Sequence, residues 1–135
     1  ANNIYELKMK IIFLKIAILF AVSSIVLGAF GAHALKDILS PIQLNSFLTG
    51  IRYQMYHALA ILIFSTNHKF FNKNLNIALW IMIVGTIIFS FSIYLLSTKD
   101  YLSINVNFLG PVTQIGGVLL SISWIILLFS TEKIK

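Results

Sequence analysis

Four apolar runs fill most of this chain, and no other feature constrains its fold as strongly. Short polar stretches separate the runs, which cover residues 11–32, 54–66, 75–97 and 111–130. A helix needs roughly 20 residues to cross a hydrocarbon core of about 30 Å. Three runs have that length, and the short one can be extended through residues 50–53. Because lipid offers the backbone no hydrogen-bond partner, such segments form helices.

The chain is therefore predicted to be an all-α integral membrane protein, a four-helix bundle in a single membrane domain of residues 1–135. The predicted spanning helices cover about residues 10–33, 51–67, 75–98 and 110–131. Only 10% of the residues are charged, whereas soluble domains carry about 25%. Since the chain has no cysteine, it forms neither a disulfide nor a thiolate metal site.

The basic residues lie at the ends of the apolar runs and not in one patch. The net charge of +6 therefore indicates contact with lipid headgroups, and no nucleic acid is expected as a partner. In a four-helix topology the two termini and the 67–74 loop share one side of the membrane. That side carries Lys8, Lys10, Lys69, Lys73, Lys133 and Lys135, and the other carries Lys36, Arg52, Lys99, Asp37 and Asp100. The positive-inside rule then predicts that both termini are cytoplasmic.

The segment before the second apolar run has its own pattern. Ser40 reads as a helix N-cap, with Pro41 at the first position and Gln43 closing a capping box. Apolar residues then alternate with polar ones at helical spacing over residues 41–49. This pattern predicts a short amphipathic interfacial helix between helices one and two. We expect Gly50 to bend the chain into the second spanning helix.

Small residues recur on three of the predicted helices. Small side chains allow two helices in a membrane to approach closely. Residues expected to serve helix packing are Ser24, Gly28, Gly31, Ala32, Gly85, Gly116 and Gly117. Packing within the bundle and contact with another copy of the chain both fit this pattern.

Polar side chains concentrate around the start of the second spanning helix. The candidate cluster is His33, Arg52, Tyr53, Gln54, Tyr56 and His57. Ionisable groups at membrane depth suggest function, although groups near a helix end can also anchor the helix and bond to a neighbour. The cluster can therefore be structural, or it can bind a lipid headgroup or a small solute.

Signatures of catalysis are weak. A metal site needs three or four ligands, and His33, His57 and Asp37 supply too few at no regular spacing. The chain has no G-x-S-x-G elbow and no phosphate-loop or dinucleotide glycine pattern. We accordingly predict no enzyme activity, no catalytic residue, no metal and no cofactor.

Three motifs resemble one known family. They are LGAFGAHAL at 27–35, FLTGIRYQMYHAL at 47–59 and LGPVTQIGG at 109–117. Together they are similar to the domain-of-unknown-function family 423, also called the transmembrane protein 256-like family. The resemblance implies a small bundle of about four helices in bacterial cytoplasmic or mitochondrial inner membranes, and it implies no established enzymatic activity. We expect a multi-pass protein of the bacterial cytoplasmic membrane.

These patterns favour a non-catalytic membrane protein that packs with itself or with a larger membrane complex and supports membrane integrity or assembly. The expected partners are membrane lipids and either further copies of the chain or the other subunits of such a complex. The alternative is a protein that binds or transports a lipid headgroup or small solute at the polar cluster.

The predicted orientation can be tested because the chain has no native cysteine. A Lys135→Cys variant should resist an impermeant thiol reagent in intact cells, because the C-terminus is expected in the cytoplasm. A Ser103→Cys variant should react, because residue 103 lies in the opposite loop. The reverse labelling pattern would overturn the orientation.

Overall fold

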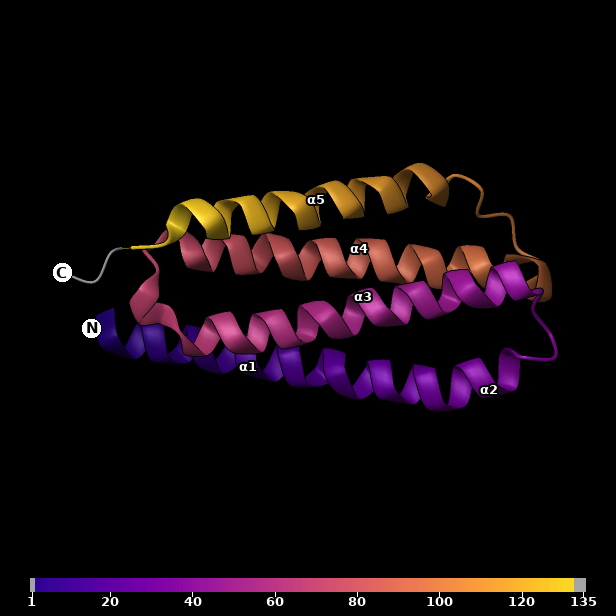
Figure 1. Ribbon diagram of the computed structural model, residues 1–135, viewed down its shortest axis with the longest axis horizontal. Coiled ribbons are helices and arrows are strands. Elements are labelled where there is room, and N and C mark those ends of the chain that lie inside the picture. The colour runs from indigo at the N-terminus through magenta and orange to yellow at the C-terminus, as the bar shows by residue number, and fades with distance from the viewer. Residues whose placement is uncertain (1, 133–135) are drawn as a thin grey trace.

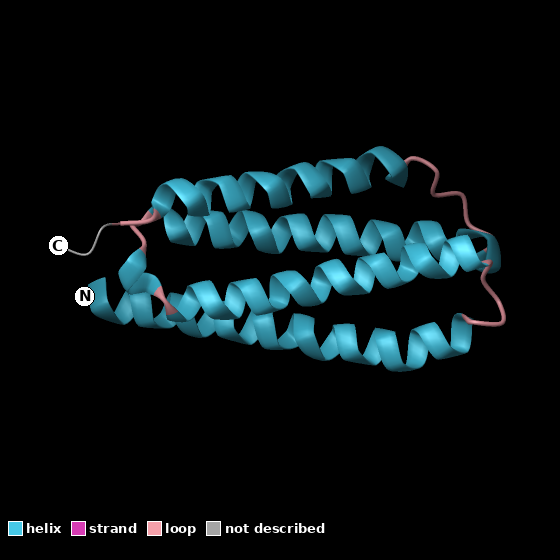
Figure 2. Ribbon diagram, viewed as in Figure 1, coloured by secondary structure: helices cyan, strands magenta, loops and turns pink. Residues whose placement is uncertain are grey.

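The computed structural model describes residues 2–132, and helices make up nearly all of them (Figure 2). The elements are α1 (Asn2–Val26), the π-helical turn η1 (Leu27–Gly31), α2 (Ala32–Leu35), α3 (Pro41–Thr66), the 3-10 turn η2 (His68–Phe70), α4 (Asn74–Leu102) and α5 (Leu109–Ser130). The elements α1, η1 and α2 follow one another without a break. The predicted all-α, four-helix architecture is confirmed.

The four long helices lie along the long axis of the molecule and alternate in direction (Figure 1). The most extensive contacts join α1 to α3, α3 to α4, and α4 to α5. Both ends of the chain consequently lie at one end of the bundle, the terminus end, and the 36–40 and 103–108 connections lie at the loop end. Ser103 ends α4 at the loop end, whereas Lys133 and Lys135 fall outside the described residues.

Within residues 2–132, three helices are long and apolar enough to cross a membrane. They are Asn3–Leu35, Asn74–Leu102 and Leu109–Phe129. With 26 residues, α3 is about 39 Å long at the usual helical rise. It is shorter than α4, which has 29 residues, but its length exceeds the roughly 30 Å of a hydrocarbon core; the polar segment 52–57 lowers its hydropathy.

The separate interfacial helix expected over residues 41–49 is not confirmed. The capping box is present, since the backbone amide of Gln43 donates to Ser40 Oγ at 3.2 Å and the backbone amide of Ser40 donates to Gln43 Oε1 at 3.0 Å. From this cap, however, α3 runs without interruption to Thr66. Residues 41–49 are thus the first turns of α3.

Close packing, and not a bend, explains the glycine at position 50. A Cβ atom there would lie 2.7 Å from the Tyr94 ring. The Gly50 carbonyl also accepts a hydrogen bond from Ser90 Oγ at 2.8 Å. The absence of a side chain therefore lets α4 come close to α3.

The closest backbone approach of this kind joins α4 to α5. A Cβ atom on Gly116 would lie 2.6 Å from the Phe89 backbone nitrogen, and one on Gly85 would lie 3.1 Å from the Leu120 nitrogen. The neighbouring Gly117 has more room, with its nearest contact 3.8 Å away in the Phe89 ring. Where membrane helices approach this closely, dispersion contacts replace the hydrophobic effect as the driving force for association.

These contacts predict opposite outcomes for two adjacent glycines. Gly116→Ala should lower the free energy of unfolding by about 1–3 kcal/mol, because the backbone of Phe89 cannot yield as a side-chain tip can. Gly117→Ala should be neutral or slightly stabilising, since alanine is the better helix former. Unfolding in mixed micelles with increasing dodecyl sulfate would measure both. Equal losses in the two variants would contradict the proposed role of Phe89.

Candidate functional site

A buried glutamine bridges two helices across α3. Gln54 is only 3% exposed. Its Nε2 donates to the Phe20 carbonyl at 3.0 Å and to Ser23 Oγ at 2.6 Å, both on α1. On its other side, Tyr94 Oη on α4 donates to Gln54 Oε1 at 2.7 Å. Both amide hydrogens and one oxygen lone pair are thereby used.

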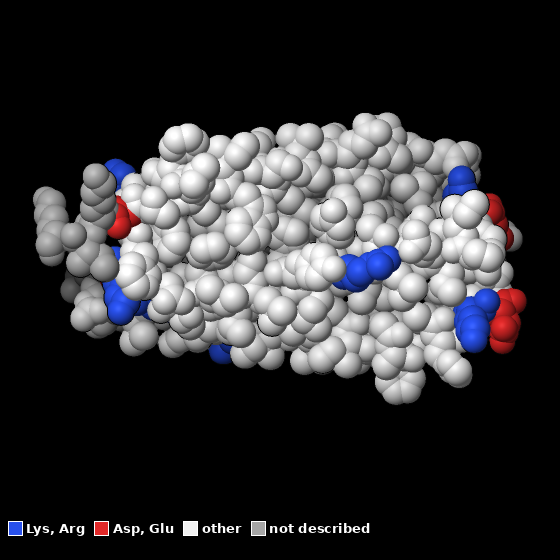
Figure 3. Space-filling view, in the orientation of Figure 1, with Lys and Arg blue, Asp and Glu red and all other residues white. Residues whose placement is uncertain are grey.

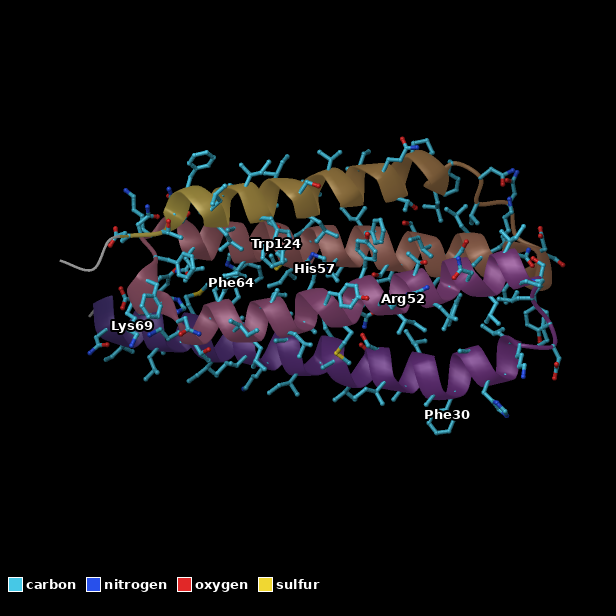
Figure 4. The ribbon with its side chains drawn as sticks, in the orientation of Figure 1. Phe30, Arg52, His57, Phe64, Lys69 and Trp124 are labelled. Carbon is cyan, nitrogen blue, oxygen red and sulfur yellow. The ribbon has the colours of Figure 1, made fainter. Side chains whose placement is uncertain are left out.

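A histidine one turn further along α3 reaches the fourth helix. His57 Nδ1 lies 2.7 Å from the Tyr53 carbonyl, and Trp124 Nε1 on α5 donates to His57 Nε2 at 3.1 Å. Because a carbonyl only accepts and an indole N–H only donates, the two partners assign a neutral imidazole with its proton on Nδ1. The two rings meet edge to face with centroids 6.1 Å apart, the His57 ring buried and the Trp124 ring partly exposed (Figure 4).

Two further pairs link helices within the bundle. Ser90 on α4 donates to the Gly50 carbonyl on α3 at 2.8 Å, and Ser92 on α4 meets Thr113 on α5 at 2.5 Å. In residues 2–132 no buried side-chain nitrogen or oxygen lacks a hydrogen-bond partner. The bonds of Gln54, His57, Ser90 and Ser92 to other helices form what we call the interhelical polar network.

The remaining cluster residues lie outside this network. Arg52, Tyr53 and Tyr56 are exposed on the lateral surface of α3. Arg52 Nη2 donates to Asn45 Oδ1 at 3.3 Å and to Thr49 Oγ1 at 3.4 Å, so its guanidinium reaches back toward the start of α3. This direction, toward the loop end, is the snorkelling conformation of a cation on a membrane helix.

His33 takes no part in the cluster. It lies exposed in α2, near the loop end of the bundle, whereas Gln54 and His57 are buried inside α3. The six candidate residues thus divide into two buried residues of the network, three exposed residues on the flank of α3, and His33 elsewhere.

Two cavities lie away from these six residues. One cavity, of about 440 Å³, opens at the loop end and is lined by residues of α3, α4 and α5 that include Gln43, Ser97 and Thr113. The other, of about 530 Å³, opens at the terminus end beside Lys10, Lys69 and Lys73. Among residues 2–132, no group of three or more His, Asp or Glu side chains is placed to hold a metal ion.

Tyr94 and Trp124 were missed by the sequence analysis as partners of the cluster. Each lies within an apolar run, 40 and 67 residues from its partner on α3. A signal was available for Tyr94, because Ser90, Tyr94 and Ser97 recur every three to four residues and so form a polar stripe on one face of α4. Trp124 has no comparable signal.

Comparison with known proteins gives consistent matches over most of the chain. A family model described as a protein of unknown function, DUF423, matches residues 27–117. A UPF0382 membrane protein of Staphylococcus epidermidis is 36% identical over 122 residues, which cover 90% of this chain and 96% of the relative. The UPF0382 membrane protein YwdK of Bacillus subtilis is 33% identical over 124 residues, covering 90% and 97%. No solved structure matches the chain.

The network predicts unequal effects for two tyrosine hydroxyls. Tyr94→Phe leaves Gln54 Oε1 buried without its donor and should lower the free energy of unfolding by about 1–3 kcal/mol. Tyr53→Phe removes an exposed hydroxyl and should change it by less than about 0.5 kcal/mol. Both values come from unfolding in the same mixed micelles. If Tyr94→Phe matched Tyr53→Phe, the Gln54 bridge would not contribute to stability.

Proposed function

Since the chain belongs to the DUF423 family and its relatives are bacterial membrane proteins, we propose that it is a small non-catalytic protein of the bacterial cytoplasmic membrane. It packs with itself or with a larger membrane complex and supports membrane integrity or the assembly of that complex. The resemblance inferred from the three sequence motifs is confirmed, because the family match contains all of them.

This proposal rests on the observation that the buried polar side chains form hydrogen bonds between helices. Gln54 and His57 are the two buried residues of the candidate cluster, and His57 is the one of them that could act as a base; both are bonded to other helices. A general base or nucleophile needs a free lone pair facing a substrate. In this network the lone pair of His57 Nε2 is occupied by the indole N–H, which supports a structural role.

The outer helices leave surface for another molecule. Near the loop end, Gly28 and Gly31 of η1 face Ile51 and Phe47 of α3, whose side chains lie 3.7 and 3.3 Å from the position that a Cβ atom would take. These glycines are therefore engaged within the chain. The exposed surface of α1 and α5 carries many large apolar side chains, among them Ile18, Leu19, Ile25, Val118, Ile125 and Leu128.

The proposal includes a fourth spanning helix and an orientation. α3 lies between α1 and α4 and buries Gln54 and His57 inside the bundle, which supports a spanning position for it despite its lower hydropathy. Both termini lie at one end of the bundle (Figure 1), and Lys8, Lys10, Lys69 and Lys73 belong to the segments at that end. The positive-inside rule places this end in the cytoplasm.

A second function, binding of a lipid headgroup or small solute near the loop end, is favoured by one observation. Charges gather at the two ends of the molecule, while an isolated basic side chain lies on the broad apolar face between them (Figure 3), where Figure 4 labels Arg52. Its bonds within the chain go to neutral oxygens of Asn45 and Thr49. The guanidinium thus keeps donors for a phosphate or carboxylate.

Single-cysteine variants test the first function, since the native chain has no cysteine. Leu19→Cys and Leu128→Cys place a thiol on the exposed faces of α1 and α5, at sites 64% and 66% exposed. At least one should form a disulfide-linked dimer in native membranes, or the purified protein should carry a stoichiometric partner in native mass spectrometry. Leu127→Cys is the matched control, because Leu127 is only 3% exposed and its thiol should not cross-link.

A monodisperse monomer without cross-links or partner would overturn this function. If that monomer retained anionic lipid, and Arg52→Ala released the lipid without loss of stability, the second function would replace the first.

If His57→Ala were neutral while Arg52→Ala unfolded the protein, the roles assigned to these two residues would be reversed.

A further inference from the structure

Lysines from three segments meet at a cavity at the terminus end. The cavity has a volume of about 530 Å³. Lys10 reaches it from α1, Lys69 from η2, and Lys73 from the residue before α4. Figure 4 labels Lys69 at this end of the bundle, and Figure 3 shows basic groups gathered there.

The charge of the cavity is positive. Three lysines line it, and the only carboxylate among its lining residues is Glu6. A second acid, Glu132, lies near η2, where its backbone amide donates to the Phe70 carbonyl at 2.8 Å. Lysine ammonium groups are compact point charges that bind phosphate oxygens. Three of them around one cavity therefore favour an anion that carries more than one charge or several oxygen atoms.

The walls supply polar side chains and an apolar floor. Asn72, Asn76 and His68 line the cavity together with the buried Leu75 and the half-buried Phe71. Lys69 Nζ lies 5.0 Å from the centroid of the Phe70 ring, a cation–π contact that limits the positions of this side chain. A ligand with a phosphate beside an apolar or glycerol portion matches this combination.

The helix that begins at the cavity adds to the positive potential. The N-cap of α4 is Lys73, and its side chain makes no capping hydrogen bond. Asn72 Oδ1 accepts from the Asn74 amide at 2.9 Å, and the Asn72 carbonyl accepts from the Leu75 amide at 3.1 Å. These bonds use two of the first amides of α4, but because α4 begins at the cavity, the positive end of its dipole lies beside the three lysines, and both favour a bound anion.

We propose that this cavity is a binding site for a phosphate group. At the end of a membrane bundle the phosphate comes either from the headgroup of an anionic phospholipid or from a soluble phosphate in the adjoining compartment. The site is distinct from Arg52, which belongs to α3 and reaches toward the loop end. It also does not depend on whether the protein packs with itself or with a larger complex.

Amide chemical shifts of the labelled full-length protein in neutral detergent micelles test the proposal at residue resolution. The probes are inorganic phosphate, dioctanoyl phosphatidylglycerol and dioctanoylglycerol, the last of which lacks the phosphate. Phosphatidylglycerol should shift the amides of residues 68–76 saturably, and dioctanoylglycerol should not. If inorganic phosphate also shifts these amides saturably, the site binds soluble phosphate. If it does not, the site binds the lipid headgroup.

Paired lysine variants separate a defined site from diffuse charge. Lys69→Gln with Lys73→Gln should weaken the binding of the active probe by at least about tenfold, as expected for the loss of two lysines near an anionic group. Lys8→Gln with Lys15→Gln removes the same charge from α1 at positions that do not line the cavity, and should change affinity by less than about twofold. Equal weakening in both variants, or no saturable shift of residues 68–76 with either phosphate probe, would overturn the site.

Discussion

Gln54 holds three helices together through a single side-chain amide. Between helices in lipid there is no hydrophobic driving force, so close packing and interhelical hydrogen bonds must supply the association energy. The Nε2 of Gln54 bonds to α1 and its Oε1 accepts from α4, and each bond fixes the distance of one neighbour from α3. His57 on the next turn bonds to α5. The order of the helices follows from this, because only a helix placed between α1 and α4 can reach both.

The polar residues of α3 make it harder to identify as a membrane-spanning helix from its sequence. The other three long helices are apolar enough to be identified as candidate spans from length and composition, whereas α3 is not. A glutamine and a histidine are expensive to expose to lipid, but inside the bundle each finds partners that satisfy it. Gln54 and His57 lower the hydropathy of α3, yet both side chains are buried against neighbouring helices.

The sequence allowed the helices and the Ser40 cap to be predicted, because both depend on local patterns. It also placed Gln54 and His57 in one candidate polar cluster. The partners of these residues could not be predicted, since Tyr94 and Trp124 are far along the chain and hydropathy does not reveal helix register. Gly50 was interpreted as a bend for a related reason. A glycine that permits close approach looks the same in sequence as one that permits a turn, and only the position of Tyr94 separates the two.

The two ends of the bundle differ in more than the number of their charges. At the loop end, the charged side chains have nearby partners. Lys36 precedes Asp37 in the sequence, Asp100 accepts from Gln43 Nε2 at 2.8 Å, and Lys99 donates to Asn107 at 2.6 Å. At the terminus end, Lys10, Lys69 and Lys73 instead surround a common space. Orientation in a membrane requires only that lysines lie near the helix ends on one side, in any arrangement. Orientation therefore does not explain why lysines from three separate segments line one cavity, whereas the proposed binding of a phosphate does.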